Sequence, residues 1–210
     1  MWRMEDVLDL YAELEVPQRP RICFDEMPYQ LVAEKRIPLP MQPGKPKRYD
    51  YEYRRMGSCN LFLFFNPFAG WRHIKVTEQR TKQDFAHCMK ELVDFHYPDA
   101  ELICVILDQL NTHTYAALYE AFEPEEARRI ARKLEFHYTP KHGSWLNMAE
   151  IEFSVLHSQC LDRRLADIPT VAVQIDAWEE SRNGCKAGVD WRFTTVSARE
   201  KLQRLYPSIS

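Results

Sequence analysis

Two aspartates each follow an apolar run that is typical of a buried strand. Asp25 ends the run RICFD and Asp108 ends the run ELICVILD. If the two strands are neighbours, about 4.8 Å apart, their carboxylates can share a metal ion. Mg²⁺ prefers such oxygen ligands, and two ions about 3.5–4 Å apart can clamp the attacking and leaving oxygens of a phosphoryl transfer. An aspartate after a strand is also a common turn former, but two such strand ends favour a site.

A third acid would complete such a cage, and the helix predicted over residues 143–161 offers Glu150 and Glu152. The two side chains point about 200° apart around a helix, so only one of them can face a given site. Helical periodicity does not choose between them, and both stay candidates at this point.

Histidines offer a rival metal site. His113, His137 and His142 fall in or near the loops that follow the same predicted strands, and imidazole suits zinc or iron. However, the sequence has no HxxxH or HxH pair, and its six cysteines include no CxxC. It also lacks the motifs GxxxxGKS/T, GxGxxG and GxSxG, which argues against P-loop, dinucleotide-binding and α/β-hydrolase chemistry.

The composition indicates one globular domain. The chain has 210 residues, of which 45% are hydrophobic and 28% charged, and this is enough for a full core. Its net charge of −3 counts against a nucleic-acid binder that is basic overall, but residues 45–55 (KPKRYDYEYRR) form a local basic segment. The longest apolar run, LFLFF (61–65), is far too short to span a membrane, and the acidic N-terminus does not resemble a signal peptide. We expect a cytoplasmic protein with reduced cysteines and no membrane partner.

Turn residues and apolar periodicity predict a mixed α/β fold. Strands are predicted over 21–26, closed by Pro28; in three stretches of 51–80, with turns at Gly57-Ser58 and at Asn66-Pro67 with Gly70; and over 101–108 and 134–140. Helices are predicted over 4–15, 81–97 (capped by Thr81), 114–122 and 143–161 (capped by Ser144), with one or two more to about residue 204 and an extended loop over 37–50. The strands that end at Asp25 and Asp108 can then lie side by side at the centre of the sheet, where function collects at the carboxyl ends.

Several blocks of the sequence resemble the catalytic domain of a DDE transposase of the bacterial insertion-sequence 630 type, in the mariner superfamily. They are CFDE (23–26), YEYRRMGSCNLFLFFNPFAGWRHIKV (51–76), LDQLNTHT (107–114), the long block HYTPKHGSWLNMAEIEFSVLHSQCLDRR (137–164), AW…RN (177–183) and WRFTT (191–195). The resemblance covers nearly the whole chain, from about residue 5 to 207, and the long block is its most specific part.

That family has an RNase H-like fold, so the resemblance implies a central mixed five-stranded sheet flanked by helices. It assigns Asp25 and Asp108 as the first two catalytic, metal-binding carboxylates. Mariner relatives carry the third acid in an LNPIEN-like stretch, which corresponds to Glu150 in LNMAEI. The implied cofactor is Mg²⁺ or Mn²⁺, with two ions, and the implied reaction cuts a DNA strand at the element's end before the freed 3′-hydroxyl attacks target DNA. DNA, as transposon ends and as target, is the implied partner, and we expect a homodimer because transposition joins two ends.

Four further residues are candidates for DNA contact or for support of the carboxylates. Asn111 and His113 closely follow the second aspartate, while His142 and Trp145 lie at the start of the predicted helix 143–161. The N-terminal amides of that helix could receive a DNA phosphate. Loop hydrogen bonding, or core packing for Trp145, explains these residue types equally well.

The sequence departs from the family pattern in three places. Gln109 stands where the family usually has asparagine, in LDNLNTH. The segment 109–149 is longer than is usual in mariner relatives, with the extra length in a predicted helical insertion around 122–133. Such transposases also carry helix-turn-helix domains upstream, and residues 1–20 show no two-helix recognition pattern.

We therefore expect residues 1–20 to be a linker helix and residues 21–207 the RNase H-like catalytic domain. The chain would then be a truncated protein, the product of a remnant gene or one product of a split reading frame. The alternative function is a catalytically incompetent remnant that keeps the fold and only binds DNA or a partner.

Overall fold

A mixed five-stranded sheet forms the centre of the protein. The structure, a computed structural model, describes residues 1–36, 41–44 and 51–206, and its strand order is β3-β2-β1-β4-β5. Strands β1 (Arg21–Glu34), β2 (Tyr53–Asn66) and β3 (Trp71–Thr77) form an antiparallel meander. Strands β4 (Ile103–Leu107) and β5 (Leu134–Tyr138) continue the sheet in parallel beside β1. The predicted central mixed sheet of five strands is therefore confirmed.

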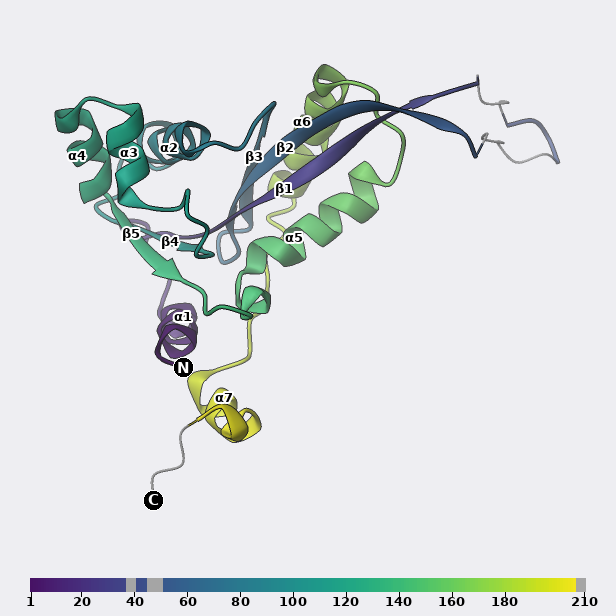
Figure 1. Cartoon of the computed structure of the whole chain (residues 1–210). Coiled ribbons are helices and arrows are strands. Elements are labelled where there is room, and N and C mark those ends of the chain that lie inside the picture. Colours follow the sequence, from purple (N-terminus) through teal and green to yellow (C-terminus); the bar gives the residue numbers. More distant parts are fainter. Residues whose placement is uncertain (37–40, 45–50, 207–210) are drawn as a thin grey trace.

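Helices cover both faces of this sheet (Figure 1). Helices α2 (Lys82–Glu91), α3 (Tyr115–Ala121) and α4 (Pro124–Arg132) share one hydrophobic core with the sheet. Helices α1 (Trp2–Ala12), α5 (Met148–Leu156), α6 (Ile168–Gly184) and α7 (Thr195–Lys201) share the other. Alternation along β1 divides its side chains between the two cores, since Phe24 lies in the first and Cys23 in the second. Helix α4 corresponds to the predicted insertion around 122–133.

Strand β1 is longer than predicted. It continues through Pro28 to Glu34, where the sequence suggested an end at Asp25. Strand β4 pairs only with residues 21–23 of β1, so the rest of β1 pairs with β2 alone among the described residues. A proline is tolerated on such an open edge because its missing N–H removes no bond of the sheet. The distal halves of β1 and β2 form a long hairpin that extends away from the helices (Figure 1).

The turn predicted at Gly57-Ser58 is wrong, because both residues lie inside β2. Gly57 has a φ of 107° close to a register shift between Gln30 and Val32 on β1, which is the geometry of a β-bulge. The turn predicted at Asn66-Pro67 with Gly70 is confirmed and joins β2 to β3. Most of the predicted loop 37–50 lies outside the described residues.

The helix predicted over 143–161 is divided into three parts, and Ser144 does not cap it. A 3₁₀ turn (Ser144–Leu146) comes first, α5 follows after Asn147, and a π-helical turn (His157–Leu161) ends the segment. Asn147 is the cap, since its side chain accepts a hydrogen bond from the N–H of Ala149. The cap predicted at Thr81 is confirmed and forms a capping box with Asp84.

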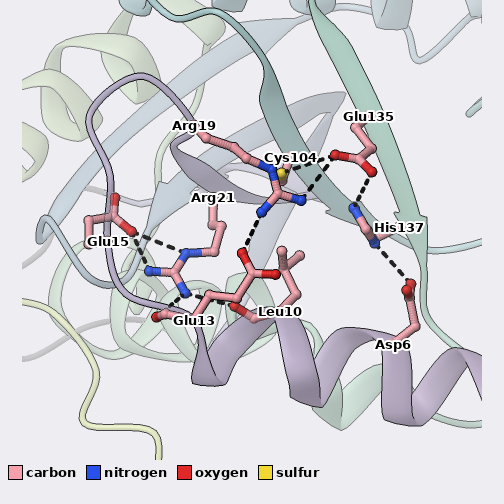
Figure 2. Close-up of polar contacts among 9 residues, drawn as sticks. All are labelled: Asp6, Leu10, Glu13, Glu15, Arg19, Arg21, Cys104, Glu135 and His137. Carbon is pink, nitrogen blue, oxygen red and sulfur yellow. Dashed lines mark hydrogen bonds and ion pairs between the residues drawn. The ribbon is translucent and has the colours of Figure 1, made fainter.

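A polar network fixes α1 against the sheet (Figure 2). The Arg21 guanidinium, which is only 2% exposed, donates to the carbonyls of Leu10 (2.7 Å) and Glu13 (2.8 Å) at the end of α1. These bonds satisfy carbonyls that a helix end leaves without partners. Nearer the start of α1, Asp6 lies 2.9 Å from Nδ1 of His137 on β5. Among the described residues, no helix has the length and apolar character that crossing a membrane requires.

Candidate active site

Asp25 lies on the central strand β1, and Asp108 directly follows the neighbouring strand β4. Strands β1 and β4 are parallel neighbours, with Cys23 opposite Ile106. Each aspartate follows its member of this pair by two residues, so the two lie at the same level along the neighbouring strands. Asp25 is mostly buried, whereas the side chain of Asp108 is 48% exposed. The pairing of the two strands, predicted from their apolar runs, is confirmed.

Glu150 approaches the same region from the first turn of α5. Asn147 fixes this helix end to β1, because its Nδ2 donates to the carbonyl of Phe24 at 2.8 Å, directly before Asp25. The hydroxyl of Tyr11 on α1 donates to the carbonyl of Leu146 at 2.7 Å. The start of α5 is therefore held from two sides, and the first turn that carries Glu150 is held with it.

The charge around Asp25 is strongly negative. Burial is the largest cause that raises the pKa of Asp25 to about 7; the N–H of Glu26 opposes the rise, and the negative charges of Glu26, Asp108 and Glu150 add to it. The carboxylates of Asp25, Asp108 and Glu150 are close enough to interact, but their oxygens do not all lie within 4.8 Å of one another in the described part of the chain. Three carboxylates offer only hard oxygen donors, and such a donor set fits Mg²⁺ or Mn²⁺.

Asp108 is held by a buried histidine. His113 is 1% exposed, with Nδ1 2.7 Å from Oδ1 of Asp108 and Nε2 3.0 Å from Oε2 of Glu26. Burial alone would lower the pKa of His113, but the two carboxylates raise it to about 9. In return, the contact with His113 lowers the pKa of Asp108. His113 is therefore cationic at neutral pH and keeps Asp108 ionised and fixed in orientation.

The remaining predicted site residues are exposed, and two of them, His142 and Trp145, line one cavity. Asn111 is exposed in the turn after β4. His142, which has a φ of 82°, is exposed and lines a cleft of about 430 Å³ together with Asp108 and Lys141. Trp145 belongs to a neighbouring cavity of about 280 Å³ and is 43% exposed beside the rings of Trp191 and Phe193.

The rival histidine site does not assemble. Within the described residues, His113, His137 and His142 do not bring their ring nitrogens together as a group of metal ligands. The first pairs with two carboxylates, the second with Asp6, and the third is exposed at the cleft.

Glu152 has a different environment from Glu150, although only one residue separates them. Glu152 is 1% exposed, and its Oε1 lies 2.9 Å from Nε of Arg72 on β3 and 2.7 Å from Nε of Arg182 on α6. The backbone N–H of Arg72 also donates to Oδ1 of Asn183 at 2.9 Å. Glu152 therefore joins α5, β3 and α6. The sequence did not indicate this cluster or the role of Glu26, although Glu26 lies in the block CFDE, Glu152 in the block 137–164, and Arg182 and Asn183 in AW…RN.

Solved structures share this fold. The chain is similar to the Mos1 strand transfer complex, with 13% identity and a TM-score of 0.59 over 89% of this chain and 56% of that chain. The chain is also similar to the Mos1 transposase paired-end complex with left transposon end, with 15% identity and a TM-score of 0.58 over 88% of this chain and 57% of that chain. The Mos1 mariner paired end complex with Mn is similar at 15% identity and a TM-score of 0.55, over 90% of this chain and 62% of that chain. The likeness confirms the expected RNase H-like fold, and the chain spans less than two thirds of the length of these relatives.

The comparison with curated proteins found no match. A family model does match, and its description is "DDE superfamily endonuclease". It covers residues 20–172, which include both strand-borne aspartates and the start of α5. The chain belongs to the DDE superfamily of endonucleases.

Proposed function

We propose that the chain is the catalytic domain of a transposase of the insertion-sequence 630 type. It hydrolyses DNA at a transposon end and joins the freed 3′-hydroxyl to target DNA. The observation that carries the proposal is the excess of negative charge at Asp25, whose pKa is raised to about 7 by burial and by the carboxylates of Glu26, Asp108 and Glu150. A cation relieves that repulsion, and a cleft beside Asp108 is open to a substrate.

Asp25, Asp108 and Glu150 would hold Mg²⁺ or Mn²⁺, with two ions in the full site. When bound, the ions supply water activation and stabilisation of the leaving oxygen in an in-line displacement. Mos1 paired-end complexes have been solved with Mn and with Mg, and carboxylate oxygens suit both ions.

Other residues of the chain prepare these carboxylates. His113 keeps Asp108 ionised, and Asn147 fixes the helix end that carries Glu150. Gln109 uses its longer side chain to donate to the carbonyl of Thr139 at 2.9 Å, so the departure from asparagine ties the loop after β4 to the end of β5. Lys141 lines the cleft beside Asp108 and offers a cation for a DNA phosphate.

The partners in this proposal are DNA and a second copy of the chain. Residues 1–20 serve as a linker helix ahead of the catalytic domain over 21–207. Arg54 and Arg55 are exposed on β2, on the extending hairpin, where they can meet the DNA backbone. Two chains would hold two transposon ends for one joining reaction.

The test combines Mn²⁺ titration calorimetry with nicking of supercoiled plasmid. Wild type, Asp108→Asn and Glu150→Gln are compared with the matched control Asp162→Asn, which changes an exposed aspartate outside the site. We expect wild type and Asp162→Asn to bind Mn²⁺ and nick the plasmid, and both site variants to lose nicking. Folded wild-type protein that neither binds Mn²⁺ nor nicks would refute the enzyme and favour the remnant that only binds DNA.

A further inference from the structure

A second group of metal-ligand side chains lies away from the three carboxylates. His73 on β3, Glu91 at the end of α2 and His96 in the π-helical turn Leu92–His96 bring their ligand atoms within 4.8 Å of one another. Nε2 of His73 lies 3.2 Å and Nε2 of His96 lies 3.6 Å from the same oxygen, Oε1 of Glu91. In the sheet, β2 and β1 separate β3 from β4, so this group is remote from Asp108.

The hydrogen bonds around the group leave acceptor atoms facing one another. Nδ1 of His73 lies 3.1 Å from Oε1 of Glu179 on α6. When that nitrogen carries the proton, a neutral His73 turns the lone pair of Nε2 toward the Glu91 oxygen. Nε2 of His96 is buried and has no hydrogen-bond partner among the described residues. A cation between the two imidazoles and the carboxylate would satisfy all three atoms together.

The surroundings also favour a cation at this position. Two carboxylates flank His73, with Oε1 of Glu179 3.1 Å from its Nδ1 and Oε1 of Glu91 3.2 Å from its Nε2. Lys75 occupies only the other oxygen of Glu91, with Nζ 2.6 Å from Oε2. The ring of His96 is confined by the ring of Trp71, with centroids 5.0 Å apart. The positions of the ligand atoms are therefore set before any ion binds.

Two imidazole nitrogens and one carboxylate oxygen are a donor set that zinc uses, with a fourth position left for water. The carboxylate of Glu179 on the far nitrogen of His73 matches the outer partner that metal-binding histidines commonly have. The side chains of His73 and Glu91 are each 24% exposed and that of His96 is 20% exposed, so an ion can enter from solvent. Single π-helical turns, such as the one that carries His96, are frequent at functional sites.

We propose that His73, Glu91 and His96 form a zinc-binding site that fastens the end of α2 and its π-helical turn to the edge strand β3. Glu179 orients His73 and extends the connection to α6. The site is separate from the catalytic carboxylates, and its role is to stabilise this side of the sheet. The proposal does not depend on the proposed transposase activity.

Another group of candidate ligands, Cys104, Glu135 and His137, is a weaker candidate (Figure 2). Arg19 already neutralises Glu135, with Nη2 3.1 Å from Oε2. Cys104 is fully buried, and burial raises the pKa of its thiol to about 12, which opposes the thiolate that a metal would need.

Zinc binding is tested by calorimetry and by the zinc content of the dialysed full-length chain. All samples carry Asp108→Asn, so that the carboxylate site contributes less. We expect one Zn²⁺ per chain, an affinity lower by about 10-fold or more in His96→Gln and His73→Gln, and a loss of about 10-fold in Glu179→Gln. The control His87→Gln, which changes an exposed histidine on α2, should bind as the parent does.

Three results would overturn the proposal. The first is a folded parent protein that binds no zinc. The second is equal zinc affinity in the parent and in both His96→Gln and His73→Gln, with circular dichroism confirming that these variants fold. The third comes from cobalt substitution: a sulfur-to-cobalt charge-transfer band that Cys104→Ser removes would assign the ion to the other cluster. Visible cobalt bands without sulfur character, lost in His96→Gln, are the expected outcome.

Discussion

Asp25→Asn should stabilise the metal-free protein at alkaline pH. The folded protein holds the pKa of Asp25 at about 7, against an ordinary value of 3.8. Ionising this carboxyl therefore costs the folded state about 4 kcal/mol, since each pKa unit is worth about 1.4 kcal/mol. Asparagine keeps the shape of the protonated acid and can still accept from the N–H of Glu26. The Asn variant has no carboxylate charge at this position, so the folded protein no longer has the cost of ionising a buried carboxyl.

The sign of the effect fixes its pH dependence. Below pH 3.8 the carboxyl is protonated in both the folded and the unfolded chain, so wild type and variant differ little. As the pH rises toward 7, the unfolded chain ionises first and wild type loses stability relative to Asp25→Asn. Above pH 7 the difference is complete, at about 4 kcal/mol.

The assay is urea unfolding at pH 5, 6.5 and 8.5 in EDTA, for wild type, Asp25→Asn and the exposed control Asp162→Asn. The difference between wild type and Asp25→Asn should grow across this series, while the control follows wild type. At 100 times the dissociation constant, Mn²⁺ should stabilise wild type by about 2.7 kcal/mol and the variant much less. If Asp25→Asn is equal to wild type or less stable at pH 8.5 without metal, the reasoning about negative charge at this site is wrong.

Three further variants test the supporting residues. His113→Gln should cost about 3 kcal/mol in urea unfolding below pH 6.5, and the cost should fade as the pH rises through the folded pKa of about 9. Glu152→Gln should cost about 3–5 kcal/mol, because it leaves the fully buried Arg72 with one partner fewer, while calorimetry should find its Mn²⁺ affinity unchanged. Asn147→Ala should lower stability by about 1 kcal/mol through the lost cap and weaken Mn²⁺ binding about 10-fold.

The sheet was predictable wherever hydrophobic pattern and pairing agree. The apolar run before Asp108 predicted a strand buried on both faces, and β4 is such a strand. The length of β1 was not predictable from local signals. A proline, which lacks an N–H, ends a strand only where a neighbouring strand would need an N–H donor at that position. Whether such a neighbouring strand lies beside Pro28 depends on how far β4 extends, and this is determined by the tertiary structure. Gly57 was misread for a similar reason, since a glycine suits a bulge as well as a turn.

The candidate site, like the sheet, was only partly predictable from the sequence. Strand ends pointed to the two aspartates, and the resemblance pointed to Glu150. The supporting contacts were not accessible, because they join residues far apart in the chain: Asn147 with Phe24, and His113 with Glu26. Ser144 was a reasonable cap for one long helix, but the break at Asn147 moved the cap three positions along.

The two glutamates of α5 show what separates a structural charge from one that a metal can use. Glu152 is buried against two arginines, so its charge is already balanced and an added cation would have to displace a guanidinium. Asp25 is also buried, but the charged groups that act most on it are all carboxylates. A carboxylate buried without its own cation is costly in the folded protein unless an ion binds. In the proposed function, the imbalance around Asp25, more than the presence of three acids, would select this end of the sheet for metal binding.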